Sequence, residues 1–176
     1  MQNRKIKLSV FLIIALVLIS NPFANRVLAE GGENLSAEFV LKDEMTRSEV
    51  SLPSNHIISF GTISGITTTD ETITLTFQAG EFDLSDLDVG DIDLTDNVGQ
   101  KTLGAVAGED IWGVAFGTDS ITFTAPDSGT TGYIDALNVI TVIIGTNATY
   151  NAVPGVNQIQ NPINAGIYQI DIAIQN

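Results

Sequence analysis

Apolar and polar residues alternate with a period of two along most of the chain from residue 55 onward. In TITLTF (72–77), three apolar residues alternate with three threonines. The same alternation recurs in five further segments: HIISF (56–60), IWGVAF (111–116), SITFT (120–124), VITVII (139–144) and IYQIDIAI (167–174). Alternation of this kind in segments rich in Thr, Val and Ile predicts half-buried antiparallel strands.

Turn-forming residues separate these segments. Gly, Pro, Asp and Asn cluster, for example, in APDSGTTG (125–132) and NPINAG (161–166), and such clusters favour tight turns. No segment after residue 30 keeps a helical period. We therefore predict an all-β fold, a single antiparallel β-sandwich of eight or nine strands in two sheets.

The first 29 residues have the pattern of a secretory signal peptide. A basic start, MQNRKIK, precedes the uncharged run 8–20, which is shorter than the roughly 20 apolar residues needed to cross a bilayer. We predict cleavage after Ala29, an extended lead-in over 30–52 with one strand at Glu38–Lys42, and the sandwich over 53–176. The chain would then be secreted or held at the cell surface. An uncleaved signal would instead be its one contact with a membrane.

Removal of residues 1–29 makes the chain strongly acidic. Four of the seven Lys and Arg lie there, so residues 30–176 keep three basic residues against 21 Asp and Glu, a formal charge of −18. Such a chain repels nucleic acid and anionic lipid, and it favours cations or a basic partner. It has no cysteine, so we expect the apolar core to hold the fold without disulfides.

The most concentrated charge is DLSDLDVGDIDLTDN (83–97), with six aspartates in fifteen positions. The apolar phase changes at Gly90-Asp91, which predicts a bulge or a tight bend. We then expect four aspartates on one outer face: Asp86, Asp88, Asp91 and Asp93. Their mutual repulsion in water costs only about 0.6 kcal/mol per pair. This face is interpreted either as solvated or as a calcium site formed by the four carboxylates, although no EF-hand order is present.

Four other residues are candidates for chemistry or for the core. His56 starts a strand in phase with the apolar residues, so we expect a core histidine rather than a catalytic base. Trp112 is likewise expected in the core. Tyr133 and Tyr150 lie near loops, where their rings could contact a ligand such as a sugar. No catalytic residue is assigned.

The two lysines of residues 30–176, Lys42 and Lys101, raise a further alternative. In some surface-fibre domains a buried lysine is linked covalently to an Asp or Asn, with the help of a nearby carboxyl group. Lys42 and Asp171 could be such neighbours, whereas ordinary surface lysines are the simpler interpretation.

Six strand and turn phrases run in order through most of residues 30–176: SNHIISF (54–60), ETITLTF (71–77), DIWGVAF (110–116), DSITFTAP (119–126), IIGTNAT (143–149) and NPINAGIYQIDI (161–172). They resemble secreted β-sandwich proteins of uncultured bacteria. The resemblance implies an immunoglobulin-like module that is secreted or displayed on the surface. The group has no assigned activity, so the resemblance implies no functional residue.

Together these observations favour an exported, non-enzymatic module with a structural or adhesive role at the cell surface or in extracellular fibres. Its partners would be other surface proteins, glycans or further copies of itself. In a fibre, the lead-in 30–52 could add as a strand to a neighbouring subunit's sheet. Two alternatives stay open: a carbohydrate-binding module, with or without calcium, and a polysaccharide hydrolase that uses paired carboxylates.

Overall fold

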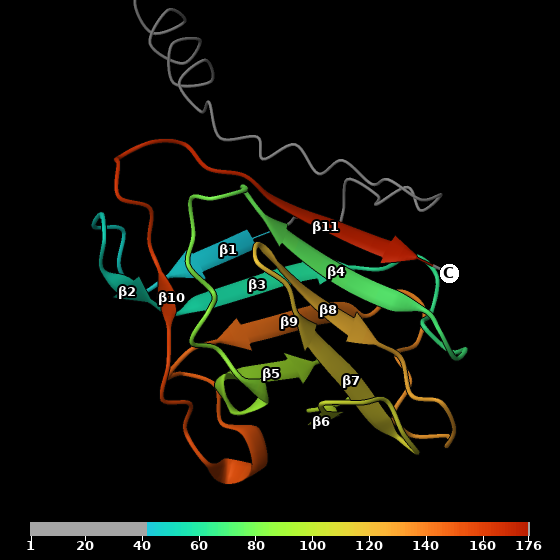
Figure 1. Ribbon diagram of the computed structural model, residues 1–176. Helices are drawn as coiled ribbons and strands as arrows, with labels where there is room; N and C mark the ends of the chain where they lie inside the picture. Colours follow the sequence, from blue (N-terminus) through green and yellow to red (C-terminus); the bar gives the residue numbers. More distant parts are fainter. Residues whose placement is uncertain (1–41, 176) are drawn as a thin grey trace, which may run out of the picture.

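The computed structural model describes residues 42–175 as an all-β fold built from mainly antiparallel sheets (Figure 1). The predicted signal peptide and the predicted strand at 38–42, apart from Lys42, lie outside the described residues. Two short 3-10 helices, η1 (Val89–Asp91) and η2 (Tyr150–Ala152), interrupt the strands.

Nine of the eleven strands within the described residues form two larger sheets, so the strand total exceeds the predicted eight or nine by a short extra pair. The first sheet has the order β1 (Lys42–Met45), β3 (His56–Gly61), β9 (Val139–Ile144), β5 (Ile92–Thr95). The second has the order β11 (Ile170–Gln175), β4 (Thr72–Phe77), β8 (Ser120–Thr124), β7 (Ile111–Phe116), β6 (Thr102–Gly104). A short pair joins β2 (Pro53–Ser54) and β10 (Ile159–Gln160). The β6–β7 pair is parallel, and the other pairs are antiparallel.

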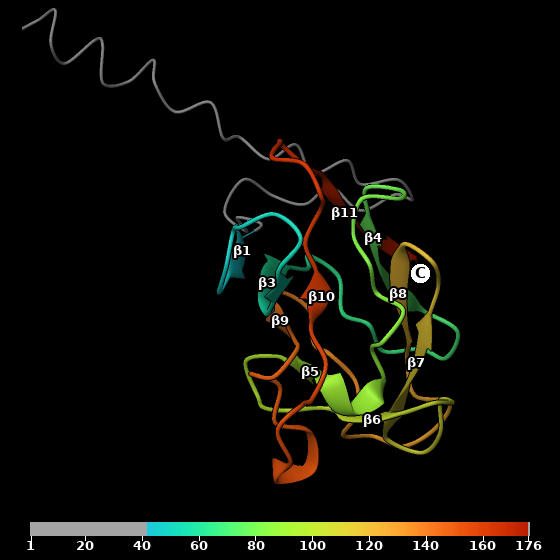
Figure 2. The same ribbon diagram turned by 60° about the vertical axis from the view of Figure 1, so that its left-hand side comes forward.

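The two larger sheets lie as two layers, and apolar residues from both form one core (Figure 2). On β4 the buried residues Ile73, Leu75 and Phe77 alternate with outward threonines. Trp112 of β7 is fully buried. The predicted alternation is thus confirmed on β4, β8 and β9, where each strand has one face on the core and one face outward.

The change of phase at Gly90-Asp91 corresponds to η1. Asp88 caps this turn: its Oδ1 accepts the Gly90 N–H at 2.7 Å, and its own N–H donates to Asp91 Oδ2 at 3.0 Å. β5 begins directly afterwards, at Ile92. The predicted bend is therefore present as this 3-10 helix, and residues 84–88 before it form no strand.

β1 is an edge strand of the first sheet. It pairs with β3 of the same chain, with Lys42 opposite Ser59 and Met45 opposite His56. Residues 42–45 belong to the predicted lead-in 30–52, so this middle part of the lead-in is a strand of the first sheet.

Candidate functional site

The acidic segment 83–97 does not form one solvated face. Asp86 and Asp88 are exposed, whereas Asp91 is fully buried and Asp93 is 3% exposed. The predicted outer face shared by all four is therefore wrong for Asp91 and Asp93. The physical reason is that the loop after β9, residues 145–157, hydrogen-bonds to both aspartates and covers this end of β5.

Asp91 anchors the covering loop through both carboxylate oxygens. Oδ1 accepts the backbone N–H groups of Val156 at 2.7 Å and Asn157 at 2.9 Å. Oδ2 accepts the Asn157 side-chain amide at 2.9 Å and the Asp88 N–H at 3.0 Å. Burial alone would raise the pKa of Asp91, but these four hydrogen bonds favour the charged form and hold the pKa below its ordinary value.

Asp93, on β5, holds the same loop at Thr149. Its Oδ2 accepts the Thr149 N–H at 2.6 Å, and its Oδ1 accepts the Gln100 side-chain amide at 2.5 Å. Both buried aspartates therefore already have N–H donors on their oxygens. Across residues 42–175, no three Asp, Glu or His side chains gather in an arrangement that could hold a metal ion.

Asp88, Asp91 and Tyr150 line one open groove of about 310 Å³. The rest of the lining is Gly90, Asn151 and residues 153–156. Tyr150 packs against the core, and its hydroxyl donates to the Leu103 carbonyl. The groove thus brings together one predicted ligand-binding residue and two of the predicted metal ligands. Tyr133 lies elsewhere, beside Lys101.

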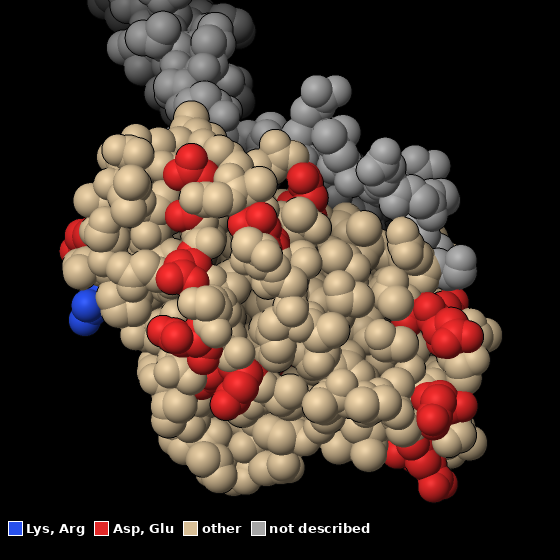
Figure 3. All heavy atoms as spheres, viewed as in Figure 1, with Lys and Arg blue, Asp and Glu red and all other residues tan. Residues whose placement is uncertain are grey.

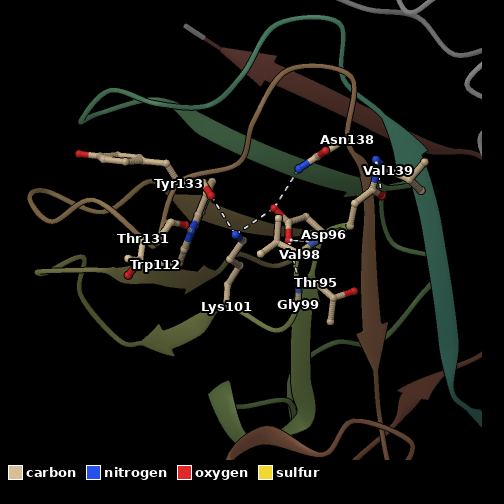
Figure 4. Close-up of polar contacts among 12 residues, drawn as sticks. Thr95, Asp96, Val98, Gly99, Lys101, Trp112, Thr131, Tyr133, Asn138 and Val139 are labelled. Carbon is tan, nitrogen blue, oxygen red and sulfur yellow. Dashed lines mark hydrogen bonds and ion pairs between the residues drawn. The ribbon is translucent and has the colours of Figure 1, made fainter.

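Lys101 is the centre of a buried polar cluster next to Tyr133 (Figure 4). Its Nζ donates to Asp96 Oδ2 at 2.9 Å and to the Tyr133 carbonyl at 2.8 Å. The side chains of Lys101 and Asp96 are 5% and 1% exposed. Asn138 Nδ2 donates to the same Asp96 oxygen at 3.1 Å. Tyr133 contributes its main chain here, and its ring points away from Lys101 (Figure 4).

Asp96 also closes the turn that carries Lys101. Its Oδ1 accepts the N–H groups of Val98 at 2.9 Å and Gly99 at 3.0 Å. Burial alone would raise the pKa of Asp96, but the hydrogen bonds from Lys101, Gly99 and Val98 and the charge of Lys101 outweigh it and hold the pKa low. An ionised Asp96 therefore faces the Lys101 ammonium inside the protein.

His56 is fully buried, which confirms the prediction of a core histidine. Its Nδ1 lies 3.0 Å from Asp43 Oδ2, and its ring packs edge-on against Phe77 and Phe82. Asp43 and Asn161 line a cavity of about 240 Å³ with largely apolar walls. Among the described residues, neither Asp43 Oδ1 nor Asn161 Oδ1 has a hydrogen-bond partner. Two lining residues of this second cavity therefore each have one buried oxygen without a hydrogen-bond partner.

No sequence pattern indicates the structural roles of Asp96, Asn138 or Asp110. Asp110 Oδ1 accepts three consecutive N–H groups, those of Thr130, Thr131 and Gly132, at 2.8–2.9 Å. The hydrogen bonds from Thr131 and Gly132 are the main cause of its lowered pKa. The sequence gives little indication of this role for Asp110, because its only feature is that it precedes a strand, and it is one of 21 acidic residues. Trp112 also holds this loop, since its Nε1 donates a hydrogen bond to the Gly132 carbonyl at 2.8 Å.

No helix in the described part of the chain has the length and apolarity that crossing a bilayer requires.

No family model and no curated protein matches the sequence. Among solved structures, the chain is similar to AvmM, a protein that catalyses macrocyclization in alchivemycin A biosynthesis. The identity is 10% and the TM-score 0.27, over 86% of this chain and 96% of that chain. A likeness this weak is evidence neither of a shared fold nor of a shared activity.

Proposed function

We propose that the chain is an exported, non-enzymatic β-sandwich module of immunoglobulin-like type, with a structural or adhesive role at the cell surface or in extracellular fibres. The signal-like first 29 residues support export. The mainly antiparallel sheets of residues 42–175 support the sandwich. Three carboxylates support a structural role, because buried Asp91 and Asp93 and partly exposed Asp110 hold loops in place through backbone N–H groups.

The outward face of the second sheet is the observation that supports adhesion most directly. On β4 and β8 it carries only hydroxyl side chains: Thr72, Thr74, Thr76, Ser120, Thr122 and Thr124. Figure 3 shows acidic side chains along two sides of this view and a broad uncharged area between them. On a chain with so many acids, an uncharged face is where a second surface can approach without charge repulsion.

Adhesion can be tested on bacterial cells that display residues 30–176. We expect these cells to aggregate, or to be retained on a surface under flow, more than cells without the chain. Thr74→Glu should reduce the effect, because it places a charge in the middle of the uncharged face. Thr141→Glu is the matched control on the other sheet: both threonines have a cross-strand hydroxyl neighbour, Thr122 at 3.3 Å and Ser59 at 3.0 Å. Equal retention of displaying and bare cells would refute adhesion.

Assembly into fibres is a variant of the same proposal. β1 pairs along the edge of β3 within one chain, and the equivalent strand of a second copy could pair there instead. Size measurement of residues 30–176 and 53–176 tests this variant. We expect larger species for the longer chain, and monomers of both would rule assembly through the lead-in out.

Carbohydrate binding is the second candidate, and the groove beside Tyr150 favours it. The groove combines an aromatic side chain with the exposed carboxylate of Asp88, and sugar hydroxyls and ring faces bind such groups. Glycan-array binding that Asp88→Ala and Tyr150→Ala weaken, and that Tyr133→Ala leaves unchanged, would place the site in this groove. Tyr150→Phe keeps the ring and should bind like the native chain, because the hydroxyl donates to the Leu103 carbonyl. An array without signal would dismiss this candidate.

A further inference from the structure

The loop after β9 carries an exposed apolar tip, which we define as Ala152, Val153, Pro154 and Val156. All four residues are exposed, Val153 to 64% and Val156 to 76%. The chain has no charged residue between positions 136 and 170. Several apolar side chains that gather on the surface of a strongly acidic chain indicate contact with another apolar surface.

The apolar tip is held in place on both sides. Before it, the Thr149 N–H donates to Asp93 Oδ2 at 2.6 Å, and after it, the Val156 N–H donates to Asp91 Oδ1 at 2.7 Å. Between these anchors Ala152 has a positive φ of 60°, a conformation that alanine rarely adopts. The tip therefore has a fixed shape before any partner binds, and binding then costs little ordering of the loop.

The opposite end of the sandwich has a recess, the cavity of about 240 Å³ that Asp43 lines. Its apolar walls come from β1, β11 and loops: Met45, Val50, Phe82, Tyr168 and Ile170. Figures 1 and 2 both show β1 and β11 at one end of the molecule and the loop 150–156 at the other. Asp43 and Glu49 also line the cavity, so an uncharged group suits it better than an acidic one.

The charges next to the apolar tip and next to the cavity are complementary. Asp88 is exposed and lines one groove together with residues 153–156. Arg47 is exposed and directly precedes residues 48–50, which line the cavity. The other basic side chain of this kind that the structure describes, Lys101, is buried. Copies with a formal charge of −18 repel each other, and a contact that brings Asp88 of one copy toward Arg47 of the next reduces that repulsion.

We propose that copies of this chain assemble head to tail, with the apolar tip of one copy in the cavity between β1 and β11 of the next. The two surfaces differ and lie at opposite ends, so each added copy leaves one free tip and one free cavity. Such a contact builds an open filament unless its rotation closes a ring. The inference rests on the proposed assembly into fibres, but the contact differs from strand exchange through the lead-in.

The size of residues 30–176, measured by analytical ultracentrifugation over a range of protein concentrations, is the first test. We expect species that grow with concentration. Val153→Asp in the tip and Val50→Asp in the cavity should each raise the concentration needed for association by about tenfold or more, because each buries an unpaired charge in the contact. Val98→Asp is the control, since Val98 is 80% exposed and lines neither the groove nor the cavity.

The outcomes of this measurement separate the two routes to fibres. Val98→Asp should associate like the native chain. Association of Val153→Asp at the native concentration would overturn the head-to-tail contact and leave strand exchange through the lead-in, which this substitution does not touch. A native chain that stays monomeric at every concentration would overturn both routes.

The charge contact has its own variant, Arg47→Glu. We expect it to raise the concentration needed for association by about two- to fivefold at low salt and by less at about 1 M salt, where the charges are screened. Association of Arg47→Glu like the native chain at low salt would overturn the proposed orientation of the two copies.

A mixture of the two aspartate variants tests the head-to-tail geometry directly. Val153→Asp keeps a native cavity, and Val50→Asp keeps a native tip. Mixed in equal amounts, at a concentration where each alone is monomeric, they should form one-to-one dimers that grow no further, because the joined pair has only a substituted tip and a substituted cavity left. Thermal melting of each variant checks that it folds like the native chain. Monomers alone in the mixture, or dimers of Val50→Asp by itself, would overturn the proposal.

Discussion

Asp91 and Asn157 hold each other by two hydrogen bonds, although 66 residues separate them. Oδ1 of Asp91 accepts the backbone N–H of Asn157, and Oδ2 accepts its side-chain amide, both at 2.9 Å. One buried carboxylate thus fixes the loop after β9 on top of β5. Gly155 permits this approach, because a Cβ there would lie 2.4 Å from the Gly145 carbonyl oxygen and 3.1 Å from the Asp91 Cα.

Asp91→Ala should therefore destabilise the fold severely. The substitution removes four accepted hydrogen bonds and leaves buried N–H groups without an acceptor, so we expect a loss of about 2–4 kcal/mol. Urea unfolding of residues 30–176 measures this loss. Asp86→Ala is the control from the same acidic segment. Asp86 is exposed, so its removal should change the free energy of unfolding by less than about 0.5 kcal/mol. Equal losses for both variants would contradict the anchoring role.

The core could be predicted from the sequence, whereas the acidic anchors could not. Alternation identifies Ile73, Leu75 and Phe77 as buried, because in a strand successive side chains point to opposite faces. The same rule placed Asp93 outward, between Ile92 and Leu94. It is buried all the same, because a loop that begins some 50 residues later covers it. Such a loop leaves no periodic signal.

The lysine site shows the same limit. Lys101 was a candidate for a covalent link from its rarity alone, but its neighbours were not predicted. Asp96 lies in a segment where aspartates recur every two or three residues, and nothing distinguishes it there. Asn138 is brought to it by the pairing of β5 with β9. Partners of this kind follow from strand order, which alternation does not determine.

Acid should destabilise the protein, and the sign follows from the pKa shifts. The pKa values of Asp91 and Asp96 are lowered from 3.8. The unfolded chain therefore binds protons at a higher pH than the folded chain does. The stability that these carboxylates contribute is present above about pH 4 and is lost as the pH falls through their folded pKa values. Denaturant unfolding between about pH 6 and about pH 2 should show this decline.

Asp91→Asn separates the contribution of this one group. The variant keeps one acceptor oxygen but has no carboxylate to titrate, so it should be less stable near neutral pH and lose less between about pH 6 and about pH 2. Asp86→Asn should follow the native curve. If the native protein were equally stable across the whole range, the coupling between these hydrogen bonds and protonation would be wrong.

Asp110 should control the order of the loop 128–132. Its Oδ1 is the acceptor for three consecutive N–H groups. In Asp110→Ala we expect hydrogen exchange at Thr130, Thr131 and Gly132 to accelerate by about tenfold or more, because these amides lose their acceptor. Asp110→Asn should lie between the two, since Asn keeps one oxygen and tolerates the positive φ of 54° at this position.

Asp127→Ala is the control for that loop. Asp127 is exposed and accepts only the neighbouring Ser128 hydroxyl, at 2.9 Å. Exchange at the three amides should stay at the native rate in this variant. Unchanged exchange in Asp110→Ala as well would mean that other contacts hold the loop.

Calcium should have no effect on the melting temperature. The four predicted ligands divide into exposed Asp86 and Asp88 and buried Asp91 and Asp93, and the oxygens of the buried pair already accept N–H groups. A cation would have to displace those donors.

Saturation of a specific site at about 100 times its Kd would stabilise the fold by about 2.7 kcal/mol, which raises the midpoint by several degrees. We expect the midpoints with millimolar calcium and with chelator to agree within about 1 °C. A rise with calcium that Asp88→Ala abolishes would show instead that the groove beside Tyr150 binds the ion, and would favour the calcium-dependent carbohydrate module over adhesion through the threonine face.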